Sequence, residues 1–471
     1  MSSGQLVSIP ASSAGAAIAR ARELGAASRA SLVVAALGAA VAAGAGTIGG
    51  DSRWLAAIGG EIAATGHVPR GVPYATAPTA AWHNPIVLAE LLFHALWSLG
   101  GDRALLVAQM LAVAGACMIL AADARRAGAR DGSAAATLGV VLVGGLSAVA
   151  VTRLQLFSLV LFPVLLALIR ADRRAPSRRI LLLWPLVALW SNLHGAVLTG
   201  VLVALAYLLL DRSRRVGVVS SGVAAAGTVA ALLVTPALLQ TPAYFWSVLH
   251  NYTAQHGYGL WAPLSPTSGF DVLLAAGAHA LGAFALRARP ATWELAAAGA
   301  LSASTVHTAR TGIWLLFLLV APAAAGLRLR PSIGRRATVA AATAALVVCA
   351  FGVAALRPSA GDVAVRRAVA LAHGEPILAD GDLAELVAVD GGTVWVGNPI
   401  DAFSLRDQAT YISWLRGEPA GDGALRHARF VVARQGSPAQ RRLLATRRPR
   451  LVVSSGGVGL YVVATITPAS S

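Results

Sequence analysis

Long apolar runs alternate with short clusters of arginine along the chain, and this alternation is typical of an integral membrane protein. Of the 471 residues 56% are hydrophobic, and the mean hydropathy is +0.67, above what a soluble domain with a polar surface shows. Seven runs are long enough to span a bilayer and four are shorter, which predicts an all-α polytopic membrane domain of about eleven transmembrane helices. The longer runs lie at about 31–48, 103–122, 134–151, 216–235, 271–286, 292–309 and 337–356, and the shorter ones at about 155–170, 180–191, 195–210 and 311–326.

The arginine clusters predict the orientation of these helices, because positive residues favour the cytoplasmic side of short loops. If every apolar run crosses the membrane, all the arginine clusters fall on its cytoplasmic side. The stretch 180–210 is basic at both ends, which favours a hairpin turning at 191–195 over one long helix. The clusters are Arg20/Arg22/Arg29, Arg125/Arg126/Arg130, Arg170/Arg173/Arg174/Arg178/Arg179, Arg212/Arg214/Arg215, Arg287/Arg289 and Arg328/Arg330/Arg335/Arg336. The predicted plan is a multi-pass plasma-membrane protein with a cytoplasmic segment 1–30, a membrane domain 31–356, outer loops 49–102 and 236–270, and an outer tail.

Composition excludes several other classes of protein. A net charge of +17 could indicate nucleic acid, but arginines placed between apolar runs suit anionic lipid headgroups instead. The two cysteines, Cys117 and Cys349, fall inside apolar runs, which argues against disulfides and cysteine-ligated metal. No His, Asp or Glu spacing is specific for a metal, so we expect no cofactor, and metal dependence is left open. The oligomeric state is left open.

The tail differs in kind from the rest of the chain. Short β-branched runs ("TVWVG", "RFVVAR", "RLVVSS", "GLYVVAT") alternate there with helix-like polar segments such as 407–416. This alternation predicts a C-terminal extracytoplasmic α/β domain over 357–471.

Polar and ionisable side chains gather at the predicted outer turns. Such groups are costly at membrane depth, so several on one face indicate a functional site. The candidates are Asp51, Glu61, Trp82, His83, Glu90, Arg153, Gln155, Asn192, His194, His307 and Arg310.

Simpler explanations exist for individual candidates. Asp51 can end the first helix or pair with Arg53, and His194 can satisfy backbone carbonyls at its turn. Arg153 and Arg310 can act as interfacial anchors. Glu61 can belong to the solvated face of a short amphipathic segment. An interfacial aromatic belt can account for the aromatic residues Tyr244, Phe245, Trp246, Tyr252 and Trp261. The convergence of all these groups on one side is harder to explain in this way.

The first outer loop resembles that of GT-C-type polytopic membrane glycosyltransferases, bacterial relatives of the dolichyl-phosphate-mannose mannosyltransferases. That family has an acid after the first helix, then aromatic residues, a Gly-Glu pair, a Gly-x-x-Pro turn, a Trp and a second acid. Further similar blocks are "RLQLFSLVLFPVLLAL", "LWSNLHGAVLTG", "HTARTGIWLLFLLVAP" and, in the tail, "GGTVWVGNPIDAF". The matching loop positions are Asp51, Trp54, Gly60-Glu61, Gly66 to Pro69, Trp82 and Glu90.

This chain departs from the family pattern at two places. The aromatic "WWHL" that often follows the first acid is replaced by Arg53-Trp54-Leu55-Ala56, and the His-Glu pair that often follows the loop Trp is replaced by Pro85-Ile86. Either departure could alter the choice of substrate or remove the activity.

The resemblance implies a sugar donor on a polyprenyl phosphate and an envelope glycan or protein as acceptor. It also implies that Asp51 acts as general base on the acceptor hydroxyl. Arg310, Arg153 and His194 would then meet the leaving phosphate, since a guanidinium offers a permanently charged fork. Two alternatives stay open: a transporter or flippase of a lipid-linked intermediate, and a non-catalytic envelope protein that binds glycan or a partner.

Overall fold

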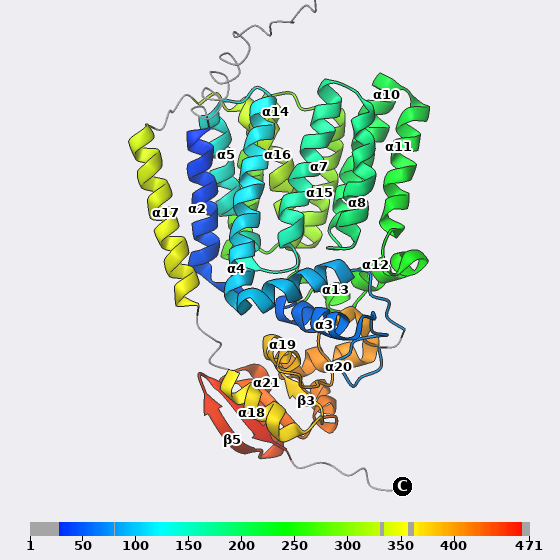
Figure 1. Ribbon diagram of the computed structural model, residues 1–471, viewed down its shortest axis with the longest axis vertical. Coiled ribbons are helices and arrows are strands. Elements are labelled where there is room, and N and C mark those ends of the chain that lie inside the picture. The colour runs from blue at the N-terminus through cyan, green and yellow to red at the C-terminus, as the bar shows by residue number, and fades with distance from the viewer. Residues whose placement is uncertain (1–27, 80, 330–333, 357–361, 464–471) are drawn as a thin grey trace, which may run out of the picture.

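The structure, a computed structural model, describes residues 28–79, 81–329, 334–356 and 362–463. A bundle of long helices lies over a smaller α/β domain, and α3 (Ser52–Thr65) crosses the end of the bundle between the two (Figure 1). Most of the predicted cytoplasmic segment 1–30 lies outside the described residues.

Each apolar run of the sequence coincides with helix in the bundle. The turn expected at 191–195 is present, because one helix ends at Ser191 and the next begins at Val197. The helices are α2 (Arg29–Ala45), α4 (Val87–Arg126), α5 (Asp131–Gly144), α6 (Leu146–Val149), α7 (Leu156–Arg174), α8 (Leu183–Ser191), α9 (Val197–Tyr207), α10 (Ser213–Val216), α11 (Val218–Ala230), α14 (Gly269–Arg287), α15 (Thr292–His307), α16 (Gly312–Gly326) and α17 (Arg335–Ala355).

In the described part of the chain, four helical segments are long and apolar enough to cross a membrane: α4, α14, Ala309–Gly326 and α17. A fifth is added if a pair of helices that meets at 99°, Val218–Leu233 with Leu238–His256, counts as one span. The chain is therefore a multi-pass membrane protein. The other apolar runs form shorter or more charged helices, so the full number of crossings, about eleven from the sequence, stays a prediction.

The two large predicted outer loops are folded into helices. In the first, α3 is followed by the opening part of α4, and α4 is broken at Gly100 and Gly101, just before the apolar run that begins at about 103. In the second, α12 (Thr241–Leu249) and α13 (Tyr252–His256) lie at the same end of the bundle as α3 (Figure 1). This end faces the C-terminal domain.

The C-terminal domain contains a four-stranded sheet in the order β3-β4-β6-β5. Strand β3 runs parallel to β4, whereas β6 is antiparallel to both β4 and β5. The strands are β3 (Ile377–Ala379), β4 (Phe430–Arg434), β5 (Arg450–Ser455) and β6 (Val458–Val462), and the helices are α18 (Asp362–Ala372), α19 (Gly381–Val389), α20 (Leu405–Leu415) and α21 (Pro438–Arg447).

The run "TVWVG" does not form the strand that its β-branched residues predict. Val394 makes only isolated bridges, to Ala75 of the first outer loop and to Ile377. Its carbonyl accepts from the backbone N–H of Thr76 at 2.9 Å, and its own N–H donates to the carbonyl of Tyr74, also at 2.9 Å. The hydrogen-bonding capacity of this segment is therefore used to dock the domain on the membrane loop.

Apolar packing joins the same two parts. Trp54 and Ile58 of α3 share one buried cluster with Leu383 and Val387 of α19, and burial of each such side chain stabilises by about 1.5–3 kcal/mol. Gly397 follows the docked segment, and a Cβ there would lie 2.7 Å from the Trp54 ring. Only glycine allows this close approach.

Candidate functional site

A short parallel ladder brings Asp51 beside Arg153. Strand β1 (Thr47–Ile48) pairs with β2 (Val151–Thr152), and the N–H of Gly49 donates to the carbonyl of Thr152 at 2.9 Å. A Cβ on Gly49 would lie 2.8 Å from Cγ of Arg153. The lack of a side chain at Gly49 therefore lets the arginine lie against the turn that carries Asp51.

Asp51 adopts an unusual conformation that its contacts must maintain. Its φ of 115° is positive, and such a conformation in a residue other than glycine costs on the order of 1–3 kcal/mol. Its backbone N–H donates to Oε1 of Glu385 at 2.8 Å, and its Oδ1 accepts from Nδ2 of Asn398 at 3.1 Å. Both partners come from the C-terminal domain.

Neither simple explanation of Asp51 holds in the structure. The first helix, α2, ends at Ala45 rather than at Asp51, and at the start of α3 the Asp51 side chain makes no capping hydrogen bond. Arg53 does not pair with it, because its guanidinium forms two bonds to Asp102, with Nη2–Oδ2 at 2.7 Å and Nε–Oδ1 at 3.0 Å. The Asp51 carboxylate is thus available for another role.

The charges around Asp51 suit a group that exchanges a proton near neutral pH. Burial is the largest influence and raises the pKa of Asp51 to about 6, while the positive charges of Arg153 and Arg310 act to lower it and Asp401 acts to raise it. A pKa close to the working pH favours general acid–base catalysis. The structure therefore brings together Asp51, Arg153 and Arg310, three residues predicted from different parts of the sequence.

The two arginines present their guanidinium groups differently. Arg153 is half-buried, and its Nε has no hydrogen-bond partner among the described residues. Arg310, in the turn between α15 and α16, is exposed and stacks over Trp261, with Cζ 4.1 Å from the ring centroid. The positive charges of both act on Asp51.

His194 lies near Arg310 but does not add a positive charge. Its Nδ1 is 2.6 Å from Oγ of Ser158, which accepts a bond from Nε1 of Trp190 at 2.7 Å. Burial, aided by the charge of Arg310, lowers the pKa of His194 to about 3. The imidazole is therefore neutral at physiological pH, which changes its expected role from cation to hydrogen-bonding group.

Trp82 contributes to a second part of the site, which includes an acid that the sequence did not single out. Its Nε1 donates to Oδ2 of Asp401 at 3.2 Å, and its ring meets Tyr244 edge-on at 6.5 Å. Burial raises the pKa of Asp401 to about 6. Asp401 lies in "GNPIDAF", so the resemblance marked the block without assigning a role to the acid.

Glu90 and Asn192 take part in local hydrogen bonding. Glu90 is fully buried, and its Oε2 accepts from Nδ2 of Asn84 at 2.6 Å. Asn192 donates to the carbonyl of Ala188 at 2.7 Å and to that of Val234 at 2.5 Å. These contacts support the turns on which the site is built.

The remaining four candidates lie at its edge or away from it. Glu61 is ten residues beyond Asp51, about 15 Å along α3 at the usual helical rise, and acts electrostatically on Tyr74. His83 and His307 are exposed, and Gln155 is half-buried at the start of α7.

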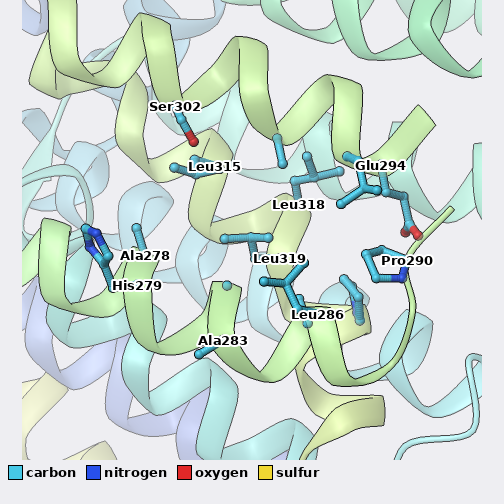
Figure 2. A pocket seen from close by; sticks show the side chains of 15 residues that line it. Ala278, His279, Ala283, Leu286, Pro290, Glu294, Ser302, Leu315, Leu318 and Leu319 are labelled. Carbon is cyan, nitrogen blue, oxygen red and sulfur yellow. The ribbon is translucent and has the colours of Figure 1, made fainter. Parts of the chain in front are cut away.

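A cavity of about 460 Å³ lies elsewhere, between α14, α15 and α16 (Figure 2). Leu286, Pro290 and Glu294 place one end of it at the α14–α15 connection, opposite the C-terminal domain. The Glu294 carboxylate is engaged by Arg170 at 3.1 Å. Among the described residues the predicted site residues all lie outside this lining, so the cavity is separate from the Asp51 site.

Comparisons with known proteins bear on the fold. No protein-family model and no curated protein matches the chain. The crystal structure of ArnT from Cupriavidus metallidurans bound to undecaprenyl phosphate is similar over 92% of this chain and 96% of that one, with a TM-score of 0.51 and 17% sequence identity. The apo structure of ArnT from the same organism is similar over 88% of this chain and 93% of that one, with a TM-score of 0.46 and 15% sequence identity.

The first of these similarities establishes the class of fold. The chain has a GT-C-type membrane glycosyltransferase fold, which confirms the fold expected from the resemblance. At this level of identity the similarity to ArnT concerns the fold alone.

Proposed function

We propose that the chain is a membrane glycosyltransferase that moves a sugar from a polyprenyl-phosphate donor to a cell-envelope acceptor at the outer membrane face. The observation that carries this proposal is the Asp51 carboxylate, which neither caps its helix nor pairs with Arg53 and which lies within electrostatic reach of Arg153 and Arg310. The undecaprenyl phosphate named for the ArnT structure supports the donor class.

The chemistry divides between the acid and the arginines. As the acceptor oxygen bonds to the anomeric carbon, Asp51 takes the hydroxyl proton. The bond from that carbon to the phosphate oxygen breaks, and its electrons leave with the polyprenyl phosphate. Arg153 and Arg310 stabilise the charge that develops on the phosphate, since a guanidinium donates to two oxygens at once.

The same observation separates this proposal from its rivals. A flippase or a binding protein would use the arginines on a phosphate but would need no base, and so would not need a strained Asp51 that neither caps a helix nor pairs with Arg53. The direct test incubates membranes containing the protein with radiolabelled polyprenyl-phosphate sugars. Transfer to envelope material that is absent from membranes without the protein is the expected result, and its absence with every donor would contradict the proposal.

We expect kcat/KM for transfer to fall as the pH is lowered through about 6. The base must be ionised, and burial raises the pKa of Asp51 to about 6, so one pH unit below this value the rate should be about tenfold lower. Asp401→Asn serves as control: it removes a charge that raises the pKa of Asp51, so the acid limb should persist at a lower pH. A profile that stays flat down to pH 5 would exclude Asp51 as base.

Topology can be tested separately from activity. Reporter fusions at Arg126, Arg214 and Arg289 should give cytoplasmic signals, and a fusion at the C-terminus an extracytoplasmic one, because the arginine clusters share one side. The outer location of the C-terminal domain is part of the proposal. A cytoplasmic signal from the C-terminal fusion would place the Asp51 site on the wrong side for this reaction.

A further inference from the structure

Two side chains of the C-terminal domain hold Asp51 from different directions. Glu385 accepts the backbone N–H of Asp51, and Asn398 donates to its carboxylate. They are separated from Asp51 by 334 and 347 residues in the sequence. The domain therefore contacts both the main chain and the reactive group of the proposed base.

Asn398 is carried by a segment that has little freedom to move. Just before it, the carbonyls of Val394 and Trp395 accept backbone bonds from the first outer loop, at 2.9 Å from Thr76 and 3.0 Å from Ala77. Gly397 then lies against the Trp54 ring. Because Trp54 is three residues from Asp51, the amide of Asn398 is fixed relative to the carboxylate to which it donates.

Glu385 occupies a position that packing alone would give to an apolar residue. It is 1% exposed on the face of α19 that packs against α3, and its Oε2 has no hydrogen-bond partner among the described residues. Burial of a carboxyl group with an unsatisfied oxygen is costly. The bond to the Asp51 N–H offsets part of that cost and satisfies the backbone donor of Asp51.

The charged and titratable groups that interact electrostatically with Glu385 are Asp51, Arg53, Arg153, Asp382 and Tyr411. Burial, with the nearby negative charge of Asp51, keeps the pKa of Glu385 well above its ordinary value. The contact with the Asp51 N–H needs only an acceptor oxygen, which a carboxylic acid and a carboxylate both offer. A glutamine can reproduce that contact.

We propose that Glu385 and Asn398 are positioning residues that fix the Asp51 carboxylate for proton transfer, so that the C-terminal domain completes the active site. This inference rests on the proposed function. It assigns a catalytic consequence to a domain that the sequence marked only as a separate outer module.

The test uses the full chain in membranes, with Asn398→Ala, Glu385→Leu and Glu385→Gln. Loss of the Asn398 N–H removes a bond that favours ionised Asp51, so the acid limb of kcat/KM should move up by about half to one pH unit. Asn398→Ala and Glu385→Leu should lower kcat about tenfold to a hundredfold, since small displacements of a reacting group cost this much. In these two variants the KM for the donor should stay within about threefold of the wild-type value. In Glu385→Gln, kcat should stay within about threefold of the wild-type value.

A second readout does not require sugar transfer. A hydrophobic carbodiimide adds to protonated carboxyl groups, so labelling of the Asp51 peptide, measured by mass spectrometry, should decline with a midpoint near pH 6. That midpoint should rise in Asn398→Ala. It should not move in Gln435→Ala, which removes an exposed amide bond to Ser454 elsewhere in the same domain.

The outcomes separate the two proposals. A labelling midpoint that moves in Asn398→Ala, with no transfer in any variant or in wild type, would support the positioning role and count against the glycosyltransferase. An unchanged midpoint in Asn398→Ala, with kcat kept in Glu385→Leu, would overturn the positioning role. So would a loss in Glu385→Gln equal to that in Glu385→Leu, because the role requires the acceptor oxygen rather than the charge.

Discussion

Asp51→Asn is expected to lower sugar transfer by about two to four orders of magnitude while expression and membrane insertion stay normal. Asparagine keeps the shape of the side chain, can accept the bond from Asn398, and is among the residues that best tolerate positive φ. Its amide is too weakly basic to take the acceptor proton. The comparison is made by single-turnover and steady-state transfer in membranes with matched protein content.

Three matched variants give this result its meaning. Asp407→Asn alters a half-buried acid of the C-terminal domain, at the start of α20, whose Oδ2 accepts from Oγ of Ser404, and should leave transfer unchanged. Glu61→Gln and Glu90→Gln test the other acids of the first outer loop. Normal transfer in Asp51→Asn, together with loss in either of these two, would move the role of base to that acid. If none of the three loop acids matters in a working assay, the glycosyltransferase interpretation of this loop is wrong.

The sequence predicted those parts of the fold that local patterns determine. Apolar runs coincide with helices because burial in lipid or in a bundle requires apolar length. The turns that carry Asp51, Arg153 and Arg310 gather at one end because antiparallel helices return alternate connections to the same side. This reasoning needs only the order of runs and charges along the chain.

Contacts between distant segments could not be predicted in this way. Arg53 is only two residues from Asp51 in the sequence, yet its guanidinium pairs with Asp102. Glu385, Asn398 and Asp401 come from the tail, and no periodicity indicates that a docked segment places them at the first loop. The charge state of His194 likewise depends on burial and on Arg310, which residue type alone does not give.

Arg310→Ala is expected to lower turnover by about 10²–10³-fold, the usual effect of removing one donor from a developing anion. Arg310→Lys should restore little of it, because a point ammonium cannot reproduce the planar fork of a guanidinium. Arg287→Ala is the matched control, since Arg287 is also exposed and stacks on an aromatic ring, with Cζ 4.8 Å from the Phe284 centroid, but at the opposite end of the bundle. An interfacial anchor and a phosphate ligand should then behave differently.

Two further measurements decide whether Arg310 acts through phosphate and through Asp51. Undecaprenyl phosphate should raise the melting temperature of the wild type and of Arg287→Ala but not that of Arg310→Ala, because a ligand stabilises only the protein that binds it. The charge of Arg310 also acts to lower the pKa of Asp51, so without it the ionised base is less favoured and the acid limb of kcat/KM should move to higher pH. Equal turnover, melting shift and acid limb in Arg310→Ala and Arg287→Ala would reduce Arg310 to an interfacial anchor and leave Arg153 as the only arginine in the proposed phosphate site.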